Sequence, residues 1–213
     1  MSTKQEAWKI QAEKVIKQME RRHFNAYYCA TKEEALEKAL SLIEKGSVIG
    51  NGGSATLKEI GLLPYIQEHP QDYHYIDRHQ AKNEDESRAI HSKIIASDYF
   101  LMSTNAFTQD GQLVNIDGNG NRVSALCYGP KHVIIVTGMN KLVPSVEAAY
   151  ERIRQEACPP NCLRIGLDNP CAKTGFCADC LSTSSICNSL VTTRMSRYPD
   201  RIHVIMVGEA LGY

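Results

Sequence analysis

The stretch Ser47-Val48-Ile49-Gly50-Asn51-Gly52-Gly53-Ser54-Ala55-Thr56 decides the fold of this chain. Its first residues are short and apolar like a buried strand, and a glycine-rich turn follows them. Ser54 is a residue type that caps helix N-termini, and the helix expected after it runs through Ile60. A strand, a tight turn and a helix in this order are typical of α/β proteins with a parallel sheet.

The same order of strand and helix repeats on both sides of this stretch. Apolar runs predict strands at 24–29, 73–76, 98–102, 132–137 and 202–207. Apolar residues spaced three and four apart predict helices from Trp8 to Met19 and from Pro144 to Ile153, and capping boxes at Thr31 and Asn83 begin two more. We therefore expect an α/β fold with a mostly parallel sheet flanked by helices.

Length and charge limit the classes of function. The 213 residues predict one domain, residues 1–213. The 24 Lys and Arg residues balance the 24 Asp and Glu residues, so no net field attracts nucleic acid or an anionic membrane. No apolar run approaches the roughly 20 residues of a membrane span, and the charged N-terminus argues against a signal peptide. We expect a cytoplasmic protein, and base rates favour a homodimer.

The glycine-rich turn is a candidate anion site. Unpaired N–H groups at a strand end, just before a helix, suit a phosphate or a carboxylate. The alternative is a tight turn whose glycines only supply positive φ. The turn lacks the lysine of a P-loop and the G-x-G-x-x-G spacing, so no nucleotide cofactor is predicted. The candidate residues are Gly50, Asn51, Gly52, Gly53, Ser54 and Thr56.

A polar stretch from Asn105 to Arg122, NAFTQDGQLVNIDGNGNR, is the second candidate site. Asp110-Gly111 and Asp117-Gly118 are hairpin signals around a short strand at 113–116. Its polar side chains form a pocket edge on one interpretation, with Arg122 pairing a carboxylate bidentately, and serve turn chemistry on the other. The candidates for orienting a substrate are Asn105, Asn115, Asp117, Asn121 and Arg122.

Six of the eight cysteines lie between Cys158 and Cys187, which we expect to be a loop-like excursion from the core. The spacing Cys171-x5-Cys177-x2-Cys180-x6-Cys187 gives a four-thiolate set for zinc or an iron–sulfur cluster, with Cys158 and Cys162 as alternative ligands. Redox chemistry at Cys177 and Cys180, or structural thiols and disulfides, are the competing interpretations. Cys29 and Cys127 are predicted to be core residues.

Four segments together resemble the LUD domain, a family associated with lactate utilisation: GNGGSAT, NAFTQDGQLVNIDGNGNR, KHVIIVTG and CAKTGFCADCLSTSSICN. The resemblance implies a fold similar to the sugar-phosphate isomerase and CoA-transferase superfamily, with ligands at strand ends near the glycine-rich turn. It implies binding of a small carboxylate or phosphorylated metabolite. The alternative is a non-catalytic, metal- or iron–sulfur-binding subunit that docks iron–sulfur redox partners in lactate oxidation.

One position departs from the pattern that the resemblance implies. CoA-transferase relatives use a glutamate nucleophile, and the LUD pattern has an acidic residue where this chain has Gln109. An amide cannot form an acyl anhydride or act as a carboxylate base. Gln109 and the neighbouring Asp110 are therefore only weak catalytic candidates, and the departure favours the non-catalytic alternative.

Overall fold

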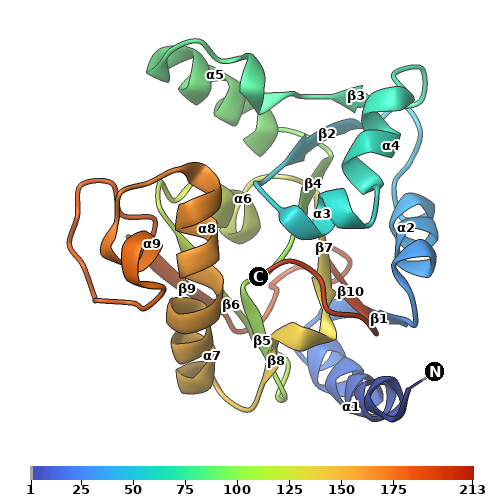
Figure 1. Cartoon of the computed structure of the whole chain (residues 1–213). Helices are drawn as coiled ribbons and strands as arrows, with labels where there is room; N and C mark the ends of the chain where they lie inside the picture. Colours follow the sequence, from blue (N-terminus) through green and yellow to red (C-terminus); the bar gives the residue numbers. More distant parts are fainter. Residues whose placement is uncertain (1) are drawn as a thin grey trace.

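The fold is built on a six-stranded sheet in a computed structural model that describes residues 2–213 (Figure 1). All five neighbouring strand pairs run parallel, so the predicted parallel sheet is confirmed. The strand order is β1 (Phe24–Cys29), β10 (Ile202–Val207), β7 (His132–Gly138), β4 (Tyr99–Met102), β2 (Val48–Asn51) and β3 (His74–Tyr75).

Helices cover both faces of this sheet. Strand β7 shows why, because Ile134 and Val136 belong to one core while Val133 and Ile135 belong to the other. A strand buried on both faces reads as a continuous apolar run. The first core contains α2 (Lys32–Ser41), α3 (Ala55–Glu59) and α4 (Leu62–Glu68); the second contains α1 (Thr3–Glu20), α5 (Glu84–Ile95) and α6 (Asn121–Cys127).

A second, four-stranded sheet lies against the second core. Its order is β8 (Leu142–Val143), β5 (Ala106–Thr108), β6 (Leu113–Asp117) and β9 (Ser189–Thr193). Phe107 and Leu113 join the core that α1 covers. Ala106 and Val114 face the opposite way and pack with α7 (Val146–Arg152) and the π-helix η3 (Ile153–Ala157).

The polar stretch forms one hairpin, not two. Strands β5 and β6 are antiparallel around Asp110-Gly111, as predicted. The Asp117-Gly118 signal leads instead into α6, because the Asp117 carboxylate accepts hydrogen bonds from the N–H groups of Asn119 and Gly120 just before that helix. A local turn signal cannot distinguish these two outcomes.

The predicted caps are confirmed at Thr31, Ser54 and Asn83, whose side chains each accept a backbone N–H of the following helix. Pro144, by contrast, precedes the helix N-cap, which is Ser145. Two short 3-10 helices, η1 (Arg78–Gln80) and η2 (Met139–Lys141), lie in the connections after β3 and β7. No helix of residues 2–213 is long and apolar enough to span a membrane.

Two predictions about the cysteines are wrong. The segment from Cys158 is not wholly loop-like, since it begins with α8 (Cys158–Ile165) and continues with α9 (Pro170–Thr174). The prolines at 159 and 160 lie at the start of α8, directly after the π-helix η3. Cys127 is exposed at the end of α6, whereas Cys29 is buried as predicted.

The β5–β6 turn offers a test of how the hairpin packs on α1. Gly111 has φ +86°, and a Cβ there would lie 2.8 Å from the backbone N of Met19. Gly46 has nearly the same backbone, φ +82°, with nothing within 4 Å of its Cβ position. Valine at either position is strained by the left-handed backbone, but only in Gly111→Val does the new side chain also clash with the backbone of α1. Gly111→Val should therefore lower the free energy of unfolding by about 2 kcal/mol more than Gly46→Val.

Urea unfolding of the two variants measures this difference directly. Equal destabilisation by Gly111→Val and Gly46→Val would contradict the close packing of the hairpin on α1.

Candidate functional site

A cavity of about 470 Å³ opens at the carboxyl ends of β2, β4 and β7. Ligand sites in open α/β sheets lie at such strand ends. The α3 turn, the α6 turn, helix α8 and the chain near Gly212 enclose it. The lining residues used below are Gly53, Ser54, Thr56, Arg78, Ser103, Asn105, Asp117, Asn121, Arg122, Lys141, Cys158 and Arg164.

The glycines of the turn permit close packing instead of positive φ, since Gly50, Gly52 and Gly53 are all outside the left-handed region. A Cβ on Gly50 would lie 2.7 Å from Ile94, and one on Gly52 would lie 2.9 Å from the Arg122 side chain. A Cβ on Gly53 would lie 3.0 Å from Nη2 of Arg78. The turn thus lets two arginines approach its backbone.

The polar residues of the turn divide into those that hold it and those that face the cavity. Asn51 is buried; its Oδ1 accepts from the Tyr75 hydroxyl at 2.7 Å and its Nδ2 donates to the carbonyl of Gly52. Ser54 caps α3 through its Oγ. Among residues 2–213, no acceptor takes the backbone N–H groups of Gly53 and Ser54. These two groups are available to an anion.

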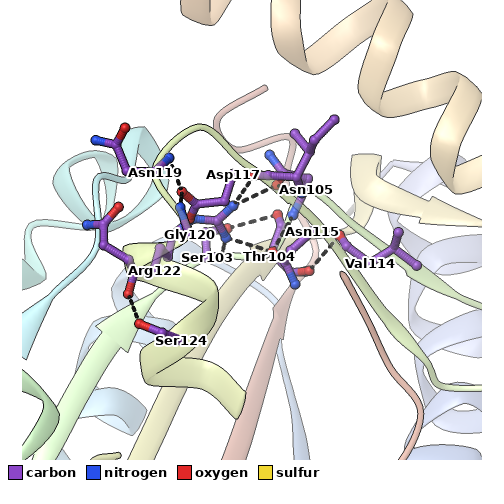
Figure 2. A network of polar contacts seen from close by, with 12 residues as sticks. Ser103, Thr104, Asn105, Val114, Asn115, Asp117, Asn119, Gly120, Arg122 and Ser124 are labelled. Carbon is purple, nitrogen blue, oxygen red and sulfur yellow. Dashed lines mark hydrogen bonds and ion pairs between the residues drawn. The ribbon is translucent and has the colours of Figure 1, made fainter. Parts of the chain in front are cut away.

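Arg122 is the centre of a buried polar network (Figure 2). Its Nη1 donates to Asn115 Oδ1 at 2.7 Å, and its Nη2 donates to Asn105 Oδ1 at 2.9 Å. The carbonyls of Ser103 and Ile116 accept from the same two nitrogens, and Nε lies 3.6 Å from the Asp117 carboxylate. The terminal nitrogens are thus engaged within the protein, so Arg122 acts here as a positioning residue.

The structure brings the other predicted polar residues to the same place. Asn115 is fully buried, and its Nδ2 has no hydrogen-bond partner among residues 2–213. Asn105 accepts from the Ile116 N–H at 3.0 Å as well as from Arg122. Asn121 begins α6 and lines the cavity. The stretch therefore forms a cavity edge, and the network fixes its shape.

Three basic residues of the cavity were not predicted from the sequence, namely Arg78, Lys141 and Arg164. Lys141 is only 3% exposed and donates to Thr56 Oγ1 and Ser103 Oγ, both at 3.2 Å. Burial, with a smaller contribution from the nearby Arg152 charge, lowers its pKa to about 7. Arg78 lies over Gly53, and its Nε is buried without a partner in the described chain. For Lys141 a signal existed, since it follows the buried strand KHVIIVTG at its carboxyl end.

The structure places several cysteines of the C-terminal segment near one another, since Cys162, Cys180 and Cys187 all act on the pKa of Cys171. The sulfurs of Cys158 and Cys187 lie 3.4 Å apart, and Cys171 is hydrogen-bonded to Cys162. Cys177 Sγ instead accepts from Arg154 Nε at 3.3 Å. Within residues 2–213, no three His, Cys, Asp or Glu side chains are arranged to hold a metal ion. A zinc or iron–sulfur site stays a prediction.

The thiols differ in acidity. Hydrogen bonding to Cys158 and the Arg154 charge lower the pKa of Cys187 to about 7, although burial opposes them. The same hydrogen bond and burial raise the pKa of Cys158. Burial and the bond to Cys162 raise the pKa of Cys171 to about 11.

Comparison with known proteins decides the family. A family model described as the LUD domain matches residues 12–207, nearly the whole chain. The chain belongs to the LUD domain family. No curated protein matches it.

Two solved structures are similar to this LUD domain. The crystal structure of a DUF162 family protein from Deinococcus radiodurans has 16% sequence identity and a TM-score of 0.53, with 97% of this chain and 99% of that chain covered. Ribose 5-phosphate isomerase A from Methanocaldococcus jannaschii has 18% identity and a TM-score of 0.35, with 63% and 62% covered. The first likeness shows the fold alone.

Gln109 and Asp110, the weak catalytic candidates, are not among the residues that line the cavity of this LUD domain. They lie in the β5–β6 turn, where Asp110 pairs with Arg22 after α1 at 2.6 Å. Burial tends to raise the pKa of Asp110, but hydrogen bonds from Thr108 and Gln112 and the Arg22 charge lower it overall. These contacts give Asp110 a structural role in fixing the hairpin.

The Arg122 network predicts a large effect on stability. Arg122→Met removes the hydrogen bonds that Arg122 donates to Asn105, Asn115 and two backbone carbonyls. This loss should lower the free energy of unfolding by about 3 kcal/mol. Arg164→Met is the matched control, because Arg164 is exposed and bonds only Asn161 within the described chain. That variant should stay within about 0.5 kcal/mol of the unmodified protein in urea unfolding. Similar values for both variants would refute the central role of Arg122.

Proposed function

We propose that this LUD domain binds a small carboxylate or phosphorylated metabolite of lactate or related organic-acid utilisation in the cavity at the strand ends. The observation that carries the proposal is the charge of the cavity lining. Four basic side chains line it, namely Arg78, Arg122, Lys141 and Arg164, against the single acidic residue Asp117. A concave site with one sign of charge concentrates ligands of the opposite sign.

Arg78 supplies the accessible cation. Arg122 already has protein acceptors, whereas no acceptor of residues 2–213 is hydrogen-bonded to the Arg78 guanidinium. Guanidinium groups match the geometry of carboxylates and phosphates and bind them with two parallel hydrogen bonds. The free N–H groups of Gly53 and Ser54 lie beside it. An oxyanion bound here satisfies the guanidinium and the backbone together.

The remaining polar groups orient the rest of such a ligand. Asn105 and Asn121 also line the cavity, and Arg122 fixes Asn105 by a hydrogen bond of 2.9 Å. A polar ligand held at two edges has a defined orientation. The family association with lactate utilisation supports small organic acids as the first ligands to examine.

Calorimetry with lactate, pyruvate and a sugar phosphate tests the proposal. Arg78→Met should weaken binding of the preferred anion at least tenfold, or about 1.4 kcal/mol, because the ligand loses its accessible cation. Gly53→Val should have a similar effect, since its Cβ would displace the guanidinium.

The control is Arg88→Met, which also removes one positive charge but from an exposed site on α5 that pairs with Glu84. It should bind like the unmodified protein. The proposal fails when no carboxylate or phosphate binds, or when Arg78→Met and Arg88→Met bind equally well.

We propose as a second candidate function that the cysteine segment binds zinc or an iron–sulfur cluster and docks iron–sulfur redox subunits. Two pairs of neighbouring thiols favour this function: Cys158 lies beside Cys187, and Cys162 lies beside Cys171. Four thiolates are the usual set for either group, and binding would require these side chains to turn towards one centre. Exposed apolar side chains on and beside the segment offer a docking surface: Leu163, Ile165, Phe176, Leu181 and Leu190.

Elemental analysis and a visible spectrum of anaerobically purified protein test this candidate. We expect zinc or iron at a stoichiometry that Cys171→Ser and Cys187→Ser both reduce. Cys127→Ser is the control, since that exposed thiol lies outside the segment. Eight titratable thiols without zinc or iron would refute metal binding, and fewer than eight without metal would indicate disulfides instead.

A further inference from the structure

Lys141 is a buried amine without a counter-ion. It ends η2, directly after the central strand β7, and its Nζ reaches the cavity floor beside Thr56 and Ser103. Within residues 2–213, no carboxylate lies within ion-pair distance of this nitrogen. A structural lysine at this depth would need a partner for its charge. The two hydrogen bonds to hydroxyl groups leave one further position on the nitrogen for contact with a ligand.

The charged groups around Lys141 act mostly against its protonation. Arg122 faces it from α6 and Arg152 from α7, and both disfavour a further positive charge. The Glu59 carboxylate, on α3, acts in the other direction and raises the pKa of Lys141. It accepts a hydrogen bond from the N–H of Gly212 at 2.9 Å. Burial dominates, so the pKa is near 7 and a large fraction of Lys141 is neutral at that pH. A neutral amine has a lone pair and is a nucleophile towards carbonyl carbon.

We propose that Lys141 forms an imine with a 2-oxo carboxylate held in the cavity. This inference rests on the proposed anion site, because the carboxylate of the ligand would occupy Arg78 and the N–H groups of Gly53 and Ser54. The turn that carries those groups also carries Thr56, whose hydroxyl is bonded to Nζ. A ketone on the carbon next to a carboxylate therefore comes close to the amine when the carboxylate is bound.

The chemical step involves no oxidation or reduction. Nζ attacks the ketone carbon, its proton passes to the former carbonyl oxygen, and loss of one water leaves a carbon–nitrogen double bond. The hydroxyls of Thr56 and Ser103 each donate or accept a proton and already contact Nζ. Lactate carries the same carboxylate but no ketone, so it binds without reacting.

Trapping with borohydride tests the imine on the unmodified protein. The protein is incubated with pyruvate, quenched with borohydride and digested, and the peptide carrying Lys141 is examined by mass spectrometry. We expect one adduct per chain with the mass of pyruvate less one oxygen, located at Lys141, and at least tenfold less with lactate. Formation should rise between pH 6 and 8 and then level off, whereas adducts at exposed lysines continue to rise towards about pH 10.

Two variants support the assignment. Lys141→Arg keeps a cation of similar length and should lose the adduct, while Lys131→Arg, an exposed lysine paired with Asp98, should keep it. Pyruvate that binds in calorimetry without an adduct at Lys141 overturns the imine and leaves the proposed function standing. An adduct spread equally over exposed lysines also overturns it. Absence of both binding and adduct removes both proposals.

Discussion

The buried guanidinium of Arg122 joins the two sheets of this protein. It bonds the carbonyl of Ser103, which follows β4 of the large sheet, and the carbonyl of Ile116 in β6 of the small one (Figure 2). A charge at this depth needs hydrogen-bond acceptors, and the two asparagine oxygens complete the set of acceptors for the two terminal nitrogens. Gly52 belongs to the same constraint, because a Cβ there would meet the Arg122 side chain at 2.9 Å. The cavity edge therefore depends on Arg122, whose two terminal nitrogens donate only to acceptors within the protein.

The electrostatics of the cavity follow from this arrangement. Arg122 brings a positive charge, and Asp117 offsets only part of it at 3.6 Å from Nε. Burial is the main reason that the pKa of Lys141 is lowered, and the nearby positive charges of Arg152 and Arg122 lower it as well. Arg78, in contrast, has no protein acceptor at its buried Nε among residues 2–213. The use of one arginine within the protein, while another has no such acceptor, supports the anion site proposed around Arg78.

The large sheet could be predicted from the sequence, but the different roles of the arginines at the cavity could not. Strands such as β4 and β7 are apolar on both faces, so they could be predicted without tertiary information. Caps at Thr31, Ser54 and Asn83 were equally local. Arg122 lies at the cavity, but its acceptors come from two segments, 103–105 and 115–116, that only the fold brings together. Arg78 follows a strand of two residues and carried no signal. Cys127 lies in an apolar context yet is exposed at the end of α6, which composition cannot reveal.

The cysteine segment and the cavity are physically one unit. Cys158 lines the cavity from α8 and lies 3.4 Å from Cys187, while residues 183–186 of the same segment line the cavity further along. The segment is fixed to the cavity edge as well, because Asn188 donates from its N–H to the carbonyl of Asp117 and from Nδ2 to that of Gly118. A cavity ligand and any group bound through Cys158 therefore act on the same wall. Linkage requires that the effect of each on the binding free energy of the other be equal. In this LUD domain, the thiols belong in any account of what the cavity binds.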